Sequence, residues 1–187
     1  MRPALVLSLL LVSGAATAAP PAGPVPKEVT SEDKLFAQLK KADTAEDAHA
    51  IEQKLQAMFR ASGSPSVDLL LTRVQAAQAA TDGKTAKQLI EAVTTIAPNY
   101  AEGWHLRATM EQAAGDDTAA LVSLQKVVLL NPRQFNALVE LADMLEDYGD
   151  KAAALKLYRR ALELDPQLDV AKNKVRELTQ RVEGRDI

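Results

Sequence analysis

Three acidic residues in the C-terminal half of the chain have the spacing that puts them on one face of a helix. Asp143, Glu146 and Asp147 stand at i, i+3 and i+4 in the run Leu-Ala-Asp-Met-Leu-Glu-Asp, and side chains at this spacing are neighbours on a helix surface. Clustered carboxylates attract cationic groups, and salt screens that attraction. The chemistry expected of this face is the binding of a segment that bears Lys or Arg.

Two arginines form a second candidate site. Arg73 and Arg107 lie one repeat length apart, and Arg107 has Glu111 four residues on, a favourable distance for a helix ion pair. In one interpretation both arginines pack their stems and turn their heads to a carboxylate or to water. In the other, their guanidinium groups hold a carboxylate of a partner, which Arg binds in bidentate fashion.

The residues that catalysis or metal binding would need are scarce. The chain has two histidines, His49 and His105, in different predicted elements, and no cysteine, so no metal site is predicted. Neither a Gly-rich phosphate loop nor a G-x-S-x-G turn occurs in the sequence. A net charge of -3 without a Lys/Arg cluster argues against nucleic-acid binding. We therefore expect no enzymatic activity and no cofactor.

The elements that hold these residues are predicted to be helices in a repeat array. The chain is 47% hydrophobic and only 4% aromatic, with eight glycines, a composition that suits helices built from Ala, Leu and Val. Pro98, Pro132 and Pro166 recur at intervals of 34 residues, and each closes an apolar segment. A strict period of this length is typical of a stack of helix pairs.

Three units align without a gap, at 67–100, 101–134 and 135–168. Close packing of paired helices needs small residues at the crossing, with larger ones filling the gaps. The sequence provides such sets at positions 4, 8, 20, 24 and 27 of each unit: Leu70, Trp104, Leu138; Val74, Ala108, Ala142; Ala86, Ala120, Ala154; Ile90, Leu124, Tyr158; and Val93, Val127, Ala161. With these residues the chain resembles the tetratricopeptide repeat (TPR) family. The resemblance implies an all-α solenoid of three helix-turn-helix repeats.

Two features depart from a regular pattern. The family places Leu at position 7, where this chain has Arg73 and Arg107, and only Leu141 conforms. The turn within units two and three contains Gly115 and Gly149, whereas the Asp-Gly pair of the first unit is displaced by one residue. A different turn is therefore expected in the first unit.

The resemblance also implies a ligand site, because TPR proteins usually bind in the concave groove formed by the first helix of each unit. Carried over position by position, the expected partner-binding groove consists of Leu71, Gln75, Gln78, Glu102, His105, Thr109, Gln112, Asn136, Val139, Asp143, Glu146 and Asp147. The family's clamp for acidic chaperone tails needs Lys and Asn at positions 5 and 9. Those positions hold neither residue here, so that activity is not expected.

The flanks of the repeats have separate roles. Residues 1–18 combine Arg2, an apolar run and the Ala16-Thr17-Ala18 motif of a cleavable signal peptide. Residues 19–30 form a Pro-rich linker, and residues 31–62 are predicted to be a helical hairpin that covers the first unit. Residues 169–187 supply the half-polar capping helix and tail that a solenoid needs at its end.

Together these features predict a periplasmic, non-enzymatic scaffold that binds a protein or peptide in its concave groove, with no stable membrane insertion after cleavage. A segment with basic residues fits the acidic part of that groove. Two alternatives remain open. The chain is an assembly factor for an exported machine, in c-type cytochrome maturation or envelope biogenesis, or it stays anchored to the inner membrane and faces the periplasm.

Overall fold

The computed structural model describes residues 29–184, and this part of the chain folds into nine α-helices with no strand. The helices are α1 Ser31–Leu39, α2 Ala45–Arg60, α3 Pro65–Ala79, α4 Gly83–Ile96, α5 Ala101–Ala113, α6 Asp117–Leu130, α7 Phe135–Asp147, α8 Lys151–Leu164 and α9 Asp169–Glu183. The expected signal peptide and most of the Pro-rich linker lie outside the described residues. Within residues 29–184, no helix is both long and apolar enough to span a bilayer.

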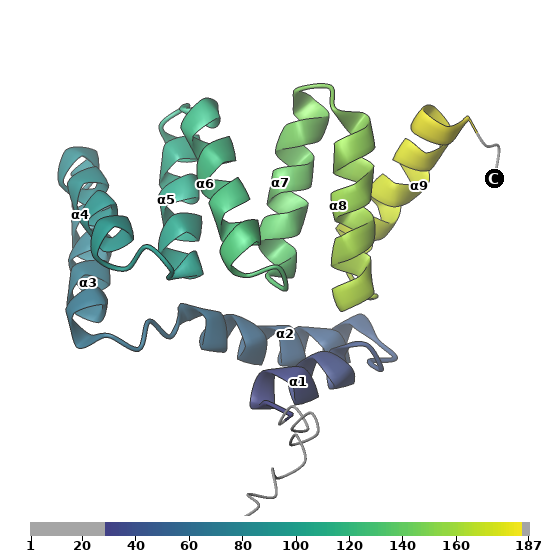
Figure 1. Ribbon diagram of the computed structural model, residues 1–187, viewed down its shortest axis with the longest axis horizontal. Coiled ribbons are helices and arrows are strands. Elements are labelled where there is room, and N and C mark those ends of the chain that lie inside the picture. The colour runs from purple at the N-terminus through teal and green to yellow at the C-terminus, as the bar shows by residue number, and fades with distance from the viewer. Residues whose placement is uncertain (1–28, 185–187) are drawn as a thin grey trace, which may run out of the picture.

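Helices α3 to α8 form three antiparallel pairs that stand side by side, as Figure 1 shows. Within each pair the helices cross at small residues: Ala108 and Ala120 in the second unit and Ala142 and Ala154 in the third are all 0% exposed. At Gly103 a Cβ atom would lie 3.0 Å from side-chain atoms of both Tyr100 and Val93. The expected fold class, an all-α solenoid, is confirmed.

The turn inside each unit has the same conformation in all three repeats. Gly115 and Gly149 follow their helices with φ of 76° and 89°, and Thr81 adopts φ of 58° at the equivalent position. Asp82 then caps α4 by accepting a hydrogen bond from the backbone N–H of Thr85, as the equivalent aspartates cap α6 and α8. The expectation of a different turn in the first unit is wrong, because Thr81 takes the left-handed conformation in place of glycine.

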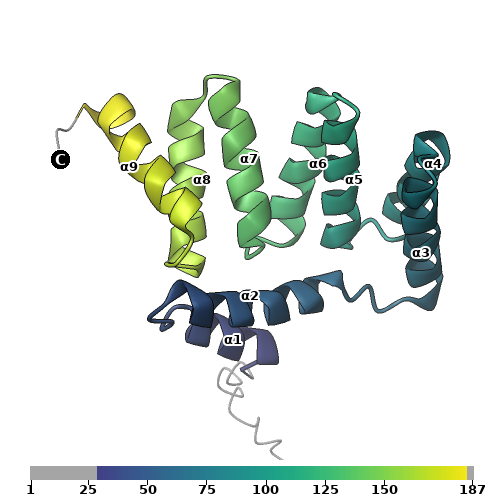
Figure 2. The same ribbon diagram turned by 180° about the vertical axis from the view of Figure 1, so that it is seen from behind.

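The hairpin of α1 and α2 does not cover the first unit, and that expectation is also wrong. Figures 1 and 2 show α2 running across the lower ends of α5 to α8, roughly perpendicular to them. Phe36, Leu39 and Leu55 of the hairpin pack in one buried cluster with Phe135 at the start of α7. Leu164 at the end of α8 and Leu168 in the loop after it pack against this cluster. The hairpin therefore buries its apolar face against the third unit.

Polar contacts attach the hairpin to each of the three loops that follow α4, α6 and α8. The Tyr100 hydroxyl donates a hydrogen bond to the carbonyl oxygen of Arg60, at 2.8 Å. Arg133 Nη1 lies 2.6 Å from Asp33 Oδ1, and Gln167 Nε2 donates to the carbonyl oxygen of Ala42 at 2.9 Å. Because these loops recur once per unit, the hairpin acts as a brace along one edge of the solenoid.

Candidate partner-binding groove

In units two and three, the charged residues expected to line the groove already have partners within the protein. His105 on α5 lies between two carboxylates: its Nε2 is 2.9 Å from Glu140 Oε2 on α7, and its Nδ1 is 3.4 Å from Glu102 Oε2. Gln134 Nε2 donates a hydrogen bond to the same Glu102 oxygen, at 2.8 Å. This cluster joins α5 to α7 and consumes the hydrogen-bonding groups that a ligand would need there.

The charge states of this cluster follow from its contacts. Burial alone would lower the pKa of His105, but hydrogen bonds to Glu102 and Glu140, together with their charges, raise it to about 10. Burial likewise opposes ionisation of Glu102, yet its hydrogen bond with His105 leaves the pKa of Glu102 below the ordinary value. His105 is therefore an imidazolium at neutral pH and serves as an internal cation between the two units.

Two of the three acidic residues of α7, Asp143 and Glu146, already have partners within the protein, while the expected binding of a basic segment stays a prediction. The Tyr158 hydroxyl on α8 donates a hydrogen bond to Asp143 and lies 3.3 Å from Glu146 Oε2. Lys174 Nζ on α9 donates to that same Glu146 oxygen at 2.9 Å. The capping helix thus supplies the basic group expected from a partner, and only Asp147 is exposed.

Tyr158 explains why these carboxylates face inward. It stands at position 24, where the first two units have Ile90 and Leu124, and it is fully buried. Burial and the hydrogen bond to Asp143 raise the pKa of Tyr158 above its ordinary range. A buried phenol needs an acceptor, and Asp143 is the one that α7 offers.

Helix α2 narrows the groove at the N-terminal ends of α5 and α7. A small cavity of about 100 Å³ lies between α2 and the starts of α5 and α7, lined by Gln56, Phe59, Arg60, Glu102, His105, Gln134, Phe135 and Asn136. Two expected groove residues, Asn136 and Val139, are half-buried. The hairpin therefore restricts access to the groove where α5 and α7 begin.

The first unit is different, because its groove residues face solvent without partners. Gln75 and Gln78 on α3 are exposed, and Leu71 is partly exposed. Within the described part of the chain, neither glutamine side chain has a hydrogen-bond partner. Further along, Thr109 is exposed with its hydroxyl bonded to the His105 carbonyl oxygen, and Gln112 is half-buried. The open half of the groove is thus its first-unit end.

A large cleft adjoins this open half. It has a volume of about 740 Å³ and lies between unit one and the second half of α5. Its lining residues are Gln78, Thr81, Gly83, Ala86, Lys87, Ile90, Glu91, Arg107, Thr109, Met110, Glu111, Ala113, Ala114 and Asp116. Two of the expected groove residues, Gln78 and Thr109, are among them. The volume falls in the range of small-molecule binding sites.

Of the two arginines, Arg107 follows the packing interpretation. Its Nε lies 2.7 Å from Glu111 Oε1, and the Ser123 hydroxyl donates to the other Glu111 oxygen at 2.6 Å. The guanidinium carbon also lies 5.4 Å from the centroid of the Trp104 ring. Arg73 is exposed and, among residues 29–184, has no partner, so the joint carboxylate site remains untested.

Several site residues escaped the sequence analysis. Glu140, Gln134 and Lys174 complete the polar clusters, but none stands at a groove position of the repeat. Asp165 is fully buried beside Glu52 of α2, and its Oδ2 has no hydrogen-bond partner among the described atoms. Burial, then the neighbouring carboxyl group of Asp165, raise the pKa of Glu52 to about 6. The one usable signal was Tyr158, a phenol at a core position.

Comparison with known proteins supports the repeat assignment. The family model described as tetratricopeptide repeat matches residues 135–168, the bounds expected for the third unit. A TPR repeat-containing protein of Rhizobium etli is 28% identical over 152 residues, which cover 81% of this chain and 74% of that protein.

Solved structures share the fold. MamA superimposes with a TM-score of 0.56 at 18% identity, over 84% of this chain and 87% of that one. The Sgt2 TPR domain from Aspergillus fumigatus gives 0.54 at 22% identity, covering 64% and 81%. The first TPR of Spaghetti (RPAP3), bound to an HSP90 peptide, gives 0.55 at 19%, covering 63% and 93%. TPR folds generally mediate protein–protein interaction. With a tetratricopeptide repeat matched at residues 135–168, three helix pairs at a 34-residue period and these likenesses, the chain contains a tetratricopeptide repeat and shares the TPR fold.

Proposed function

We propose that this protein is an exported, non-enzymatic interaction module that binds a peptide or helix of a partner protein at the first-unit end of its concave groove. The observation that carries the proposal is the contrast between the two halves of the groove. Gln75 and Gln78 are exposed beside a cleft of about 740 Å³, and among residues 29–184 their side chains have no hydrogen-bond partner. In units two and three the charged groove residues already have partners within the protein: Glu102 and His105 bond to each other, and Asp143 and Glu146 bond to Tyr158 and Lys174.

The contrast matters because a group contributes most to binding when it exchanges water for the partner without first breaking a hydrogen bond or ion pair within the protein. Displacing His105 from Glu102 and Glu140, or Lys174 from Glu146, would leave partly buried charges without partners, at a cost of about 1–2 kcal/mol each. Free amides on an exposed helix carry no such penalty. A partner therefore gains more on α3 than on α7.

The periplasm is the proposed location, on the strength of Arg2, the apolar run and the Ala16-Thr17-Ala18 motif. Cell fractionation with N-terminal sequencing tests it. A mature chain that starts at Ala19 or Pro20 in the soluble extracytoplasmic fraction fits the proposal. An intact chain from Met1 in the membrane fraction contradicts it in favour of the anchored alternative.

Site-specific photo-cross-linking in cells tests the interaction surface. We would place p-benzoylphenylalanine at Gln75 in the open half, at Asp147 in the third unit, and at Gln88, which is exposed on α4 away from the groove positions. A discrete protein adduct from position 75, absent at 147 and 88, is expected. An adduct at 147 alone, or at 88 alone, would overturn the proposed surface, and the adduct's identity would show whether the partner belongs to an assembly machine.

A further inference from the structure

We propose that the cleft between α4 and α5 binds a single leucine-sized aliphatic side chain, presented by an extended or helical segment of the partner. This inference rests on the proposed function and names the chemistry that the partner brings to the open half of the groove. The three repeats provide the argument, because the same interface occurs twice in the chain with different residues.

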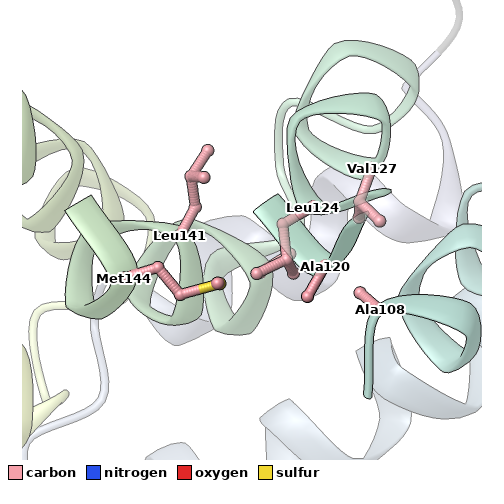
Figure 3. Close-up of a cluster of buried hydrophobic side chains, with 7 residues drawn as sticks. Ala108, Ala120, Leu124, Val127, Leu141 and Met144 are labelled. Carbon is pink, nitrogen blue, oxygen red and sulfur yellow. The ribbon is translucent and has the colours of Figure 1, made fainter. Parts of the chain in front are cut away.

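Between units two and three, the interface is filled by the chain itself. Leu141 and Met144 of α7 are buried in one cluster with Ala120 and Leu124 of α6. Figure 3 shows Met144 pointing across toward Leu124, with Leu141 on the same helix. The cluster shows what this interface accepts: an isobutyl group at position 7 and a thioether at position 10.

Between units one and two, one of these groups is replaced. Met110 occupies position 10 as Met144 does, and Ala86 and Ile90 correspond to Ala120 and Leu124. Position 7, however, is Arg107, whose guanidinium group turns to Glu111 and Trp104. The space that a leucine side chain fills in the next interface therefore adjoins an open cleft.

The walls of the cleft match an aliphatic occupant better than a charged one. Ala86, Ile90, Met110, Ala113 and Ala114 provide its apolar lining. Its carboxylates are already engaged in part, since Glu111 is held by Arg107 and Ser123 and Asp116 caps α6. At the edge of the cleft, Lys87 and Glu91 carry opposite charges one helix turn apart. The edge therefore favours neither a cationic nor an anionic ligand.

A peptide selection with matched variants tests the inference. Purified mature protein would be panned against a random dodecapeptide library displayed on phage, and affinities of enriched peptides measured by fluorescence anisotropy. We expect enrichment of one Leu, Ile or Met anchor, and replacement of that anchor by Asn should weaken binding roughly ten- to hundredfold.

Arg107→Leu should place an internal leucine where the anchor of the partner would lie, as Leu141 does in the next interface, and weaken binding to a similar extent. Glu111→Gln accompanies it, because the buried carboxylate would otherwise lose its cation. Arg73→Leu is the matched control, since it changes the same repeat position on a helix that no preceding unit faces. Met110→Phe puts a larger and more rigid side chain into the apolar wall of the cleft while leaving the Arg107–Glu111 pair intact, and keeps the test decisive if the double variant fails to fold.

The outcomes separate the inference from the proposed function. Selected peptides that bind wild type, Met110→Phe and the Arg107 double variant equally would overturn the cleft assignment, while an adduct at position 75 would still support the interaction module. Failure to enrich any anchored peptide would overturn the inference too. If the wild-type protein is a dimer and Arg107→Leu makes it monomeric, the cleft is occupied by a second copy of this chain. That result would contradict binding of a different partner protein.

Discussion

The guanidinium group of Arg133 joins two parts of the chain a hundred residues apart. Its Nη1 lies 2.6 Å from Asp33 Oδ1, and its Cζ lies 3.9 Å from the centroid of the Phe36 ring. Thr30 and then Arg133 lower the pKa of Asp33 to about 2 by hydrogen bonding, so the pair is ionised over the physiological range. This contact holds α1 on the loop between units two and three.

Arg133→Ala should loosen the hairpin without unfolding the repeats. Hydrogen exchange of amides in α1 and α2 should accelerate roughly tenfold, because a stacked and ion-paired cation is lost. Exchange in α5 to α8 should change little. Lys34→Ala, an exposed residue of α1, is the control. Uniform acceleration across all helices would mean that the hairpin and the solenoid form one cooperative unit.

Thr81→Gly should stabilise the protein. Thr81 adopts φ of 58°, a conformation that costs a β-branched residue about 1–2 kcal/mol, while glycine gives back part of the gain as entropy of the unfolded chain. We expect a net gain of about 0.5–1 kcal/mol in urea denaturation. Gly115→Thr at the equivalent turn should lose stability. If Thr81→Gly were neutral or destabilising, the shared turn geometry would be wrong.

Glu52→Gln should change the pH dependence of stability. The pKa of Glu52 is raised to about 6, so the folded protein binds this proton more tightly than the unfolded chain does. The stabilisation of the fold by the protonated Glu52 carboxyl is therefore fully present below pH 4.5 and is lost as pH rises through 6. At pH 7 the variant should be more stable than wild type by about 1 kcal/mol, a figure reduced for solvent screening.

Denaturation curves at several pH values check this. The difference between Glu52→Gln and wild type should shrink toward zero as pH falls to 4.5. Glu46→Gln, on the exposed part of the same helix, should show no such trend. If the difference in stability stays constant with pH, the interaction of Glu52 with Asp165 does not cause a pH dependence of stability.

Glu146→Gln should destabilise the third unit. Glu146 is 12% exposed and bonds to Lys174 and Tyr158, so neutralising it should cost about 1–2 kcal/mol. Asp147→Asn, on the exposed side of the same turn, should fall within about 0.5 kcal/mol of wild type. Thermal melts of the two variants decide the point. Equal stability would mean that the acidic face is open after all.

The repeat core could be predicted because its determinants are local and periodic. Ala108, Ala142 and Ala154 recur at fixed positions, and each position has one steric requirement that the sequence displays directly. The position of the hairpin could not be predicted in this way. Its amphipathic stripe shows that Leu39 and Leu55 are buried, but many apolar surfaces would accept them.

The groove was predicted in outline but not in its pairing. Helical register placed Glu102 and His105 on the same surface, and the structure brings them together. Register says nothing of Glu140, which reaches His105 from the next unit, or of Lys174, which reaches Glu146 from the cap. Such contacts depend on the rotation between successive units, which arises from packing along the whole stack.

The central claim is that a partner binds the first-unit end of the groove, and hydrogen–deuterium exchange of the complex tests it most directly. The mature protein would be compared with and without a peptide selected as above or the cross-linked partner. The account predicts slower exchange in 65–96 and 106–114, with 135–147 unchanged. Protection confined to 135–147, with none on α3 or α4, would contradict it.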